Sequence, residues 1–326
     1  MELSATSSAV ALIRKARALL IGSTLFWGLS FPLMRSLELA QKEHASGVSD
    51  SAVACADMAV RFAVAALIFL PFYARHLRSV TWKEWSQAIG LAFFAGMGLY
   101  LQTLGLAWTD ASVSAFLTQL YTLLVPLIVA LRDRRPPTLR VMGACVLVLI
   151  GVALLSPGVL DHFNLGPGAL VIIISAGFIA CQIVWVERPI YVENRSGLVT
   201  FLMFAFLSGF FFLGYFGVGG TVEHVTSLYE TPVLWGLMLA LVLFCTVVNF
   251  WIMNAWQRCV SATEAGLIYC LEPVVATVFS AFLPGWLSHL AGFSYPNEVL
   301  TWTLFAGGAL ILVATMLVAT EKRTAD

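Results

Sequence analysis

Charged residues are scarce in this chain, and that scarcity excludes most soluble folds. Only 11% of the 326 residues are charged, whereas 60% are apolar. A chain of this composition has too little polar surface to cover itself in water. Lysine and arginine balance aspartate and glutamate at 18 each, so there is no excess of positive charge of the kind that binds nucleic acid.

Sequence patterns for metal, redox and hydrolytic chemistry are also missing. The six cysteines form no CxxC pair, and most lie in apolar runs, where cysteine packs as a small hydrophobic residue. The five histidines are scattered, and neither GxSxG, HExxH nor a phosphate-binding glycine loop occurs. We therefore expect no metal, no cofactor and no enzymatic activity. A membrane enzyme acting on a lipid-linked substrate is the alternative that these absences argue against.

Long apolar segments dominate what is present. A bilayer core about 30 Å thick is crossed by roughly 20 apolar residues in a helix. The sequence therefore predicts an all-α polytopic membrane protein with ten transmembrane helices. The expected helices span 18–38, 52–73, 84–106, 111–131, 138–157, 167–187, 198–218, 232–256, 262–284 and 298–319.

Ten helices divide into two sets of five, and an odd set size places the second set upside down relative to the first. Inverted repeats of this kind build the substrate path of many secondary transporters. No ATP-binding domain is present, so uphill transport would need an ion gradient or a partner protein. The predicted divisions are a cytoplasmic segment 1–17, a first repeat 18–157, a linker 158–166, a second repeat 167–320 and a cytoplasmic tail 321–326.

The distribution of lysine and arginine indicates the orientation. All eighteen except Arg35, Lys42 and Arg61 fall on the side of the predicted membrane that holds both termini. Cytoplasmic loops carry the excess of these residues, so both termini are expected in the cytoplasm. The first apolar run lacks a clear cleavage site and is expected to stay as an uncleaved helix. We expect an integral protein of the bacterial plasma (inner) membrane, in contact with the lipid bilayer.

A short turn of small and polar residues recurs in each half. The two turns are 107–115 and 259–267, about 152 positions apart (263 − 111). Their acidic and hydroxyl side chains are suited to cap the helix that follows. The two turns share little sequence identity, so the equal number of helices is the stronger sign of a duplication.

Several short motifs follow one another in order along the ten segments. They are Trp27-Gly28 with Phe31, Arg61-Phe62, the run 115–121, Gly143, Leu271-Glu272-Pro273-Val274, and Glu298 nine residues before Gly307. In this order, over about residues 18–319, the chain resembles the EamA-type transporters of the drug/metabolite transporter superfamily. The resemblance implies a ten-helix carrier that moves a small organic metabolite, such as an amino acid or an amphipathic compound, out of the cell by alternating access.

Three departures from the family leave the substrate open. The segment 132–135 is rich in arginine where the family usually has an acidic residue, the first outer loop 39–51 is long, and 284–297 is an insertion. A carrier of sugar phosphates or nucleotide sugars, from the same superfamily, is an alternative. Such ligands should need several inward-facing lysines or arginines, and Arg61 is the only basic residue well inside a predicted helix.

Asp57 and Arg61 are charged residues inside the second predicted helix. They are four residues apart with the acid first, which favours an intrahelical ion pair. One interpretation is that they neutralise each other near the outer leaflet. The other is that the Arg61 guanidinium binds a carboxylate or phosphate of the substrate.

Glu272 is the only carboxylate near the centre of a predicted helix. It precedes Pro273, which removes a backbone donor and kinks a helix. A buried carboxylate is a candidate for exchanging protons during transport. The alternative is a structural carboxylate that is bonded to a neighbouring helix.

Other polar and aromatic residues within the apolar segments are candidates for the substrate path. A polar side chain in hydrocarbon normally faces the interior of the helix bundle, although helix–helix hydrogen bonds explain such residues equally well. Gln102 and Asn254 match across the 152-residue spacing. The sequence does not indicate an oligomeric state. The complete set of path candidates is Trp27, Phe31, Arg61, Tyr100, Gln102, Gln119, Tyr121, Gln182, Asn249, Asn254 and Tyr269.

Overall fold

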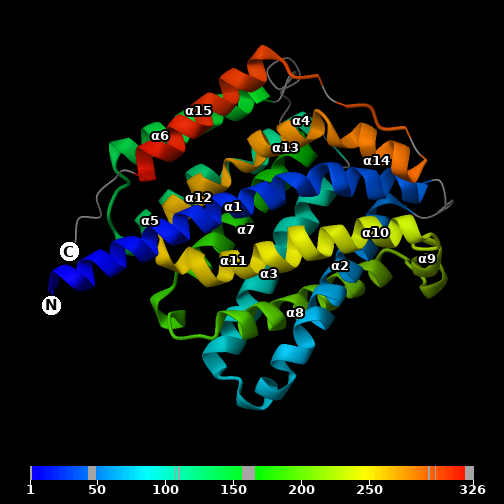
Figure 1. The fold of residues 1–326 in the computed structure, drawn as a ribbon, viewed down its shortest axis with the longest axis horizontal. Coiled ribbons are helices and arrows are strands. Elements are labelled where there is room, and N and C mark those ends of the chain that lie inside the picture. The colour runs from blue at the N-terminus through cyan, green and yellow to red at the C-terminus, as the bar shows by residue number, and fades with distance from the viewer. Residues whose placement is uncertain are drawn as a thin grey trace.

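The computed structural model describes residues 2–42, 49–106, 108, 111–155, 166–292, 294–297 and 299–319. Within these residues the regular structure is entirely helical (Figure 1). Glu298 of the family motif, the turn residues Thr109 and Asp110, and the basic residues Lys322 and Arg323 lie outside the described residues.

The helices follow the predicted apolar segments closely. The first half of the chain contains α1 (Glu2–Lys42), α2 (Asp50–Tyr73), α3 (Trp82–Leu106), α4 (Ala111–Thr118), α5 (Tyr121–Asp133) and α6 (Leu139–Leu155). The second half contains α7 (Pro167–Val186), α8 (Ser196–Gly217), α9 (Val222–Ser227), α10 (Pro232–Ala240), a π-helix (Leu241–Val248), α11 (Asn249–Trp256), α12 (Ala262–Tyr269), α13 (Glu272–Ser280), α14 (Leu283–Ala291) and α15 (Trp302–Ala319).

Eight segments of the described chain are long and apolar enough to cross a membrane. Two shorter apolar helices, Leu139–Leu154 and Trp302–Val318, occupy the places expected for the fifth and tenth helices. These segments make the protein an integral, polytopic membrane protein. The eight longer segments are Val10–Gln41, Ser51–Ser79, Trp82–Gly105, Phe116–Asp133, Pro167–Val186, Ser196–Gly217, Pro232–Cys259 and Ala262–Ser280.

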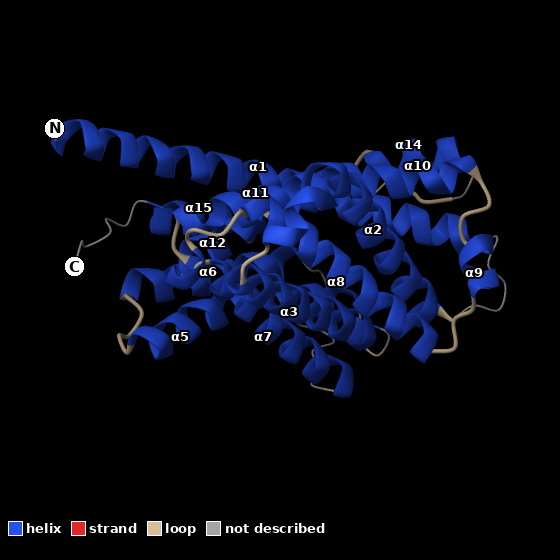
Figure 2. Cartoon of the chain, turned by 90° about the horizontal axis from the view of Figure 1, so that it is seen from below, coloured by secondary structure: helices blue, strands red, loops and turns tan. Residues whose placement is uncertain are grey.

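The first helix begins earlier than the hydropathy pattern indicates. α1 starts at Glu2 instead of near residue 18, and its N-terminal turns extend beyond the rest of the bundle (Figure 2). The stretch before residue 18 contains several alanine, leucine, arginine and lysine residues and no glycine or proline. These residues have high helix propensity, so the helix continues past the apolar part of its sequence.

Helices from the two halves of the chain pack against each other. α3 packs along α7, α2 along α8, and α6 along α15. The last pair lies along one edge of the bundle (Figure 1). α1 contacts α10, the π-helix and α11 on one side and α13 on the other. Every large helix contact therefore joins a first-half helix to a second-half helix, which makes the two halves one folded unit.

Two predicted helices are broken near their middle. The expected segment 111–131 consists of α4 and α5, which are separated by Gln119 and Leu120, and 262–284 consists of α12 and α13, which are separated by Cys270 and Leu271. Between α4 and α5 the backbone makes i→i+3 bonds, such as Thr122 N–H to the Gln119 carbonyl at 3.0 Å. Such short stretches of tighter winding interrupt a helix without exposing its polar groups.

A proline follows each break. Pro126 lies four residues after Thr122 and cannot donate to its carbonyl, and Pro273 lies in the first turn of α13. The sequence motif Glu272-Pro273 indicates the second break. The first is harder to find because the irregular residues precede Pro126 by six or more positions.

Candidate functional site

The two helix breaks lie against each other in the bundle. The Thr122 hydroxyl in the first turn of α5 lies 2.8 Å from the Cys270 thiol at the end of α12. The Cys145 thiol on α6 donates to the Thr122 carbonyl at 3.3 Å, the carbonyl that Pro126 leaves without its helical donor. Backbone polar groups in hydrocarbon need partners inside the protein, so these contacts stabilise the irregular backbone.

An aromatic group lies beside this junction. The Trp27 ring on α1 meets the Tyr269 ring on α12 edge-on, with centroids 4.9 Å apart, and meets Phe250 on α11 at 6.1 Å. The Tyr269 hydroxyl donates to Gln257 Oε1 at 2.8 Å, and Gln257 Nε2 donates to the Ile183 carbonyl on α7 at 2.7 Å. This chain of contacts joins α1, α12 and α7 around the breaks.

Asn249 fixes the Trp27 ring from the opposite side. In the amide orientation that satisfies both of its groups, its oxygen accepts a hydrogen bond from Trp27 Nε1 at 2.6 Å and its nitrogen donates to the Ser23 carbonyl at 3.2 Å. Asn249 is fully buried. It is the first residue of α11, directly after the π-helix.

Glu272 lies on the side of the second break that faces α1. Tyr269, three residues earlier, packs on Trp27. Val275, three residues later, packs on Gly28, where an added Cβ would lie 2.6 Å from Val275 Cγ1. Glu272 is half-buried between these two contacts.

The Glu272 carboxylate has no protein partner among the described residues. Their hydrogen bonds and ion pairs include none to this group. The titratable groups within electrostatic range are the Tyr121 hydroxyl and the Cys270 thiol. The interpretation of Glu272 as a structural carboxylate bonded to a neighbouring helix therefore finds no support in the described contacts.

Gln119 offers a second unpartnered acceptor at the first break. Its side chain is 7% exposed, and Oε1 is buried without a hydrogen-bond partner. Gln119 is three residues before Thr122, which contacts Cys270 at the other break. The junction thus presents an amide oxygen from one break and a carboxylate from the other.

Asp57 and Arg61 do not form the expected ion pair. Asp57 Oδ1 accepts hydrogen bonds from Gln41 Nε2 at 2.8 Å and from the Tyr229 hydroxyl at 2.5 Å, and no ion pair joins it to Arg61 among the contacts of the described residues. The hydrogen-bond partners of both side chains come from other parts of the chain instead, because the α2 surface that carries these residues packs against α1 and the π-helix.

Arg61 donates hydrogen bonds to residues of the π-helix. Its Nε donates to the Thr246 hydroxyl, its Nη2 donates to the Cys245 carbonyl at 3.2 Å, and its Nη1 lies 3.5 Å from Met34 Sδ. Each of its nitrogens therefore has a protein partner. A π-helix has backbone groups outside the regular α pattern, and the guanidinium satisfies one of these carbonyls.

The remaining path candidates are spread through the bundle. Gln102 donates to the Thr118 hydroxyl at 3.1 Å, and Asn254 donates to the Thr200 hydroxyl at 3.0 Å, so both make helix–helix hydrogen bonds. Gln182 is buried on α7, and Phe31 is 47% exposed.

Tyr100 lies toward the far end of α3. Its ring contacts Phe210 on α8 edge-on, with centroids 6.5 Å apart. It also lines a small cleft of about 80 Å³ between α2, α3 and α8, together with Ser51, Cys55 and Phe211. The structure thus places Trp27, Gln119, Tyr121, Asn249, Tyr269 and Glu272 at or beside the helix breaks. Gln102 also reaches the first break through Thr118, whereas Phe31, Arg61, Tyr100, Gln182 and Asn254 lie elsewhere.

Three residues of the junction were not found from the sequence. Thr122 and Cys270 read as ordinary residues of apolar helices, and only their mutual contact gives them a role. Gln257 lies at the end of a predicted helix, yet it is fully buried and bonded to Tyr269. The sequence signal that could have identified Gln257 is its amide side chain directly after a predicted membrane helix.

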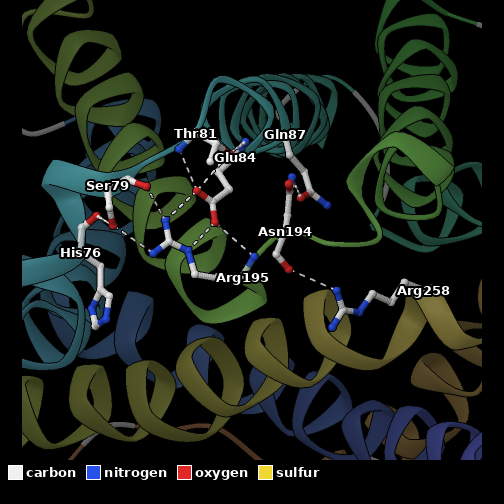
Figure 3. A network of polar contacts seen from close by, with 8 residues as sticks. All are labelled: His76, Ser79, Thr81, Glu84, Gln87, Asn194, Arg195 and Arg258. Atoms are coloured by element: carbon white, nitrogen blue, oxygen red, sulfur yellow. Dashed lines mark hydrogen bonds and ion pairs between the residues drawn. The ribbon is translucent and has the colours of Figure 1, made fainter.

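A network of polar contacts joins the two halves where the start of α3 meets the loop between α7 and α8 (Figure 3). The Arg195 guanidinium binds the Glu84 carboxylate through two hydrogen bonds, Nε to Oε1 at 2.7 Å and Nη2 to Oε2 at 2.8 Å. Glu84 also accepts from the Thr81 backbone at 2.9 Å. The hydrogen bonds to Glu84 raise the pKa of the Arg195 guanidinium further, so the guanidinium stays charged at physiological pH.

The same network extends to the loop before α12. Asn194 donates to Gln87 Oε1 at 2.7 Å, and Arg258 donates to the backbone carbonyls of Val192 and Asn194 at 2.9 and 3.2 Å. On the neighbouring helices, Arg17 of α1 forms an ion pair with Glu264 in the first turn of α12. Among the described residues, ion pairs between the two halves therefore include Glu84–Arg195 and Arg17–Glu264 near these helix starts.

Comparisons with known proteins agree with this architecture. Residues 14–156 match the EamA-like transporter family. Over 295 residues the chain is 28% identical to an uncharacterized transporter of Archaeoglobus fulgidus, a match that covers 90% of this chain and 82% of that protein. A protein crystal structure shares the fold with a TM-score of 0.66, at 18% identity over 94% of this chain and 96% of the other. The first half of the chain is therefore similar to the EamA-like transporter family, and most of the chain is similar to a transporter, which supports a relationship to the EamA-type transporters of the drug/metabolite transporter superfamily.

Proposed function

We propose that this protein is a secondary transporter that exports a small organic metabolite, such as an amino acid or an amphipathic compound, by alternating access. Its membrane is the bacterial inner membrane, with both termini in the cytoplasm. The proposal is supported by the asymmetry of lysine and arginine between the two sides of the chain.

The observation that carries the proposal is the pair of broken helices that meet near the middle of the bundle. Transporters bind substrates at discontinuous helices where two repeats meet. Here the breaks meet at the contact of Thr122 with Cys270, beside the packed rings of Trp27 and Tyr269. Each break also carries a polar group without a hydrogen-bond partner among the described residues, namely Gln119 Oε1 and the Glu272 carboxylate.

Helix boundaries support an inverted duplication. The starts of α4 and α12 are 151 residues apart (262 − 111), as are the starts of α5 and α13 (272 − 121). At the same spacing, α3 corresponds to the stretch from α10 through α11. The domains proposed are the repeats 18–157 and 167–320, joined by the linker 158–166.

The helix contacts support the same duplication. The contact of α3 with α7 corresponds to that of α1 with α10 and α11, and the contact of α5 with α7 corresponds to that of α1 with α13. The pairs α2 with α8 and α6 with α15 correspond to themselves, and so does the contact between the two broken helices, α4–α5 and α12–α13, each taken as a whole. A two-fold axis through the junction accounts for all of these contacts.

The Glu84–Arg195 and Arg17–Glu264 ion pairs are proposed to close the cytoplasmic end in this conformation. Both join helices of opposite halves, so both must separate for the junction to open to the cytoplasm. The small cleft beside Tyr100 lies at the opposite end of α3 from Glu84. This arrangement favours an access path on the outer side.

Proton coupling is proposed to run through Glu272. A buried carboxylate without a partner is costly when it is charged, so its charge is neutralised either by a proton or by a ligand. The alternative of a sugar-phosphate or nucleotide-sugar carrier would need free basic groups inside the bundle. Within the described part of the chain, the guanidinium of Arg61 is already bonded at every nitrogen, which disfavours that alternative.

Reconstitution tests this function. Purified protein in liposomes is screened with labelled amino acids and amphipathic compounds, with and without an imposed pH gradient. At least one compound should cross faster than in protein-free liposomes, and the pH gradient should drive it. Glu272→Gln should abolish the dependence on the pH gradient, whereas Glu193→Gln, at an exposed carboxylate, should leave it intact. Absence of transport for the whole panel would contradict the transporter proposal, and unchanged pH dependence in Glu272→Gln would contradict the coupling.

A further inference from the structure

We propose that the arginine-rich connection between α5 and α6 binds the phosphate of an anionic phospholipid, of the phosphatidylglycerol type, at the membrane surface. Its central residues are Arg134 and Arg140. The connection lies at one end of the bundle (Figure 2), and its ligand is a molecule of the membrane itself. The inference therefore goes beyond the proposed transport function.

Arginine is concentrated in this connection more than anywhere else in the chain. Residues 132–140 contain four arginines, and no other stretch of nine residues has as many basic residues. None of the four is a lysine. The planar guanidinium group binds phosphate oxygens through two parallel N–H bonds, whereas the lysine ammonium acts as a point charge. The composition of the connection therefore fits a phosphate ligand.

The connection lies where the chain leaves the apolar part of the membrane. The candidate membrane span Phe116–Asp133 ends directly before Arg134, and the next apolar helix begins at Leu139. Leucines mark both boundaries, since Leu131 is 81% exposed and Leu139 is 91% exposed. A surface with leucine on the membrane side and arginine on the water side matches a phospholipid, whose acyl chains and phosphate are arranged in the same order.

Backbone contacts and two prolines limit the shape of the connection. The backbone N–H groups of Arg134 and Arg135 both donate to the Ala130 carbonyl, the second at 3.1 Å. Arg134 has a left-handed backbone conformation with φ of 54°, and Pro136 and Pro137 follow. A proline restricts its own backbone and that of the residue before it. The arginines are thus presented on a turn of limited freedom, which reduces the entropy lost on binding.

The acidic residues beside the connection contact Arg132. Its guanidinium donates to both carboxylate oxygens of Asp133, at 2.7 and 3.2 Å, and its Nη1 lies 3.7 Å from Glu187 Oε2 at the end of α7. Arg134 and Arg140 are exposed and have no ion-pair partner among the described residues. Since an arginine stays protonated, both keep a positive charge that a phosphate can neutralise.

A further arginine lies beside the connection. The contact of Arg132 with Glu187 places Arg188, the next residue, at the same end of the bundle. The guanidinium carbon of Arg188 lies 4.5 Å from the centre of the Trp185 ring and 5.7 Å from that of the Tyr191 ring. Tryptophan and tyrosine are typical of the headgroup level of a membrane, and contact with a ring leaves the charge in place. Arg188 therefore adds to the positive potential at this boundary.

The position favours a lipid over a soluble anion. A free phosphate would be held at this exposed surface by charge alone, and salt at 0.1 M screens such attraction beyond about 10 Å. A lipid also brings acyl chains to the exposed leucines. It stays in the plane of the membrane, so its effective concentration at the connection is high. The site should therefore prefer a phosphate that the membrane carries.

Two lipids that differ in headgroup charge test the inference. Full-length protein in detergent is titrated with phosphatidylglycerol or with phosphatidylcholine of the same acyl chains, and native mass spectrometry measures the fraction of protein that carries lipid. One arginine near an anionic headgroup contributes roughly fivefold to binding. Arg134→Gln/Arg140→Gln should therefore bind phosphatidylglycerol roughly 25-fold more weakly, and its binding of phosphatidylcholine should not change.

The matched control is Arg75→Gln/Arg78→Gln. It removes the same number of positive charges from two exposed arginines in the 3₁₀ helix Ala74–Ser79 between α2 and α3, and binding of phosphatidylglycerol should change little. Arg134→Lys/Arg140→Lys keeps the charges without the paired N–H groups and should retain part of the binding. Thermal unfolding in detergent shows whether each variant is folded. If the first double variant does not fold, each of its two single variants should bind roughly fivefold more weakly.

Equal binding of the two lipids by the unchanged protein would overturn the inference. An equal loss in the two glutamine double variants would also overturn it, because binding would then follow total charge and not this connection. Inorganic phosphate is the third arm of the test. If millimolar phosphate displaces phosphatidylglycerol, the ligand is a soluble anion and the assignment to a lipid is wrong. If phosphatidylglycerol stays bound in phosphate and is lost only from variants of the connection, the lipid site is supported.

Discussion

Gly28 sits where α1 approaches α13 most closely, and replacing it by alanine should move the wall of the proposed site. A Cβ at this position would lie 2.6 Å from Val275 Cγ1, 2.7 Å from Val275 Cβ and 2.8 Å from the backbone nitrogen of Ala276. The last contact is to backbone, so a side-chain rotation alone does not remove the clash. The two helices must separate by several tenths of an ångström or more.

The matched control is Gly22→Ala on the same helix. An added Cβ at Gly22 meets no atom within 4 Å. Alanine is better than glycine inside a helix by about 1 kcal/mol, and both variants receive this gain. Overpacking costs roughly 1–3 kcal/mol, and only Gly28→Ala incurs it. The two variants should therefore differ in free energy of unfolding by about 1–3 kcal/mol.

The same displacement should affect transport more than stability. Val275 follows Glu272 by one turn, so a shift of α13 away from α1 moves the carboxylate relative to Trp27. A misplacement near 1 Å can lower the rate of a positioned step by about 100-fold. Unfolding in detergent and initial transport rates in liposomes are measured for both variants. If Gly28→Ala is as stable and as active as Gly22→Ala, the close approach of α1 and α13 does not hold the site.

Three further outcomes are expected. Arg195→Ala leaves the buried Glu84 carboxylate without its guanidinium partner. It should lower the free energy of unfolding by only roughly 1–2 kcal/mol, because the arginine is partly exposed. Unfolding in detergent measures this loss, and Arg195→Lys should recover part of it. Pro273→Ala restores a backbone donor at the second break, so it should raise stability while slowing transport, and equal transport would argue against a role for the break. Arg61→Gln should destabilise the protein by about 1–3 kcal/mol, because the carbonyl of Cys245 loses its partner, and unfolding in detergent measures this.

The sequence was sufficient for the fold at the level of segments and for the family. Apolar runs bounded by glycine, proline and charges predicted the helices to within a few residues for most of the chain, as at 52–73 against Asp50–Tyr73. The predicted resemblance to EamA-type transporters is confirmed. A bilayer requires apolar side chains along the whole length of a crossing helix, so the composition of a segment is enough to identify it.

Individual side-chain contacts could not be predicted from the sequence, because they depend on partners that are far away along the chain. The spacing of Asp57 and Arg61 predicted an ion pair, yet Tyr229 and Thr246 take the two side chains. Local spacing describes an isolated helix, whereas in this bundle the neighbouring helices supply better-placed donors and acceptors. The sequence indicated Glu272 as a carboxylate beside a proline, and the structure adds that no described residue forms an ion pair with it.

The π-helix determines which side of α11 faces the centre of the molecule. Successive residues of an α-helix are turned by about 100° from one another, so the wider winding of Leu241–Val248 changes the angular phase of everything after it. With this rotation of α11, Asn249 forms a hydrogen bond with Trp27 and Asn254 forms one with Thr200. Removing one residue between 241 and 248 would rotate both amides by about a quarter of a circle away from these partners. The length of this short segment therefore sets where these amides lie relative to the proposed site, although the described contacts of its residues include none to the junction of the two broken helices.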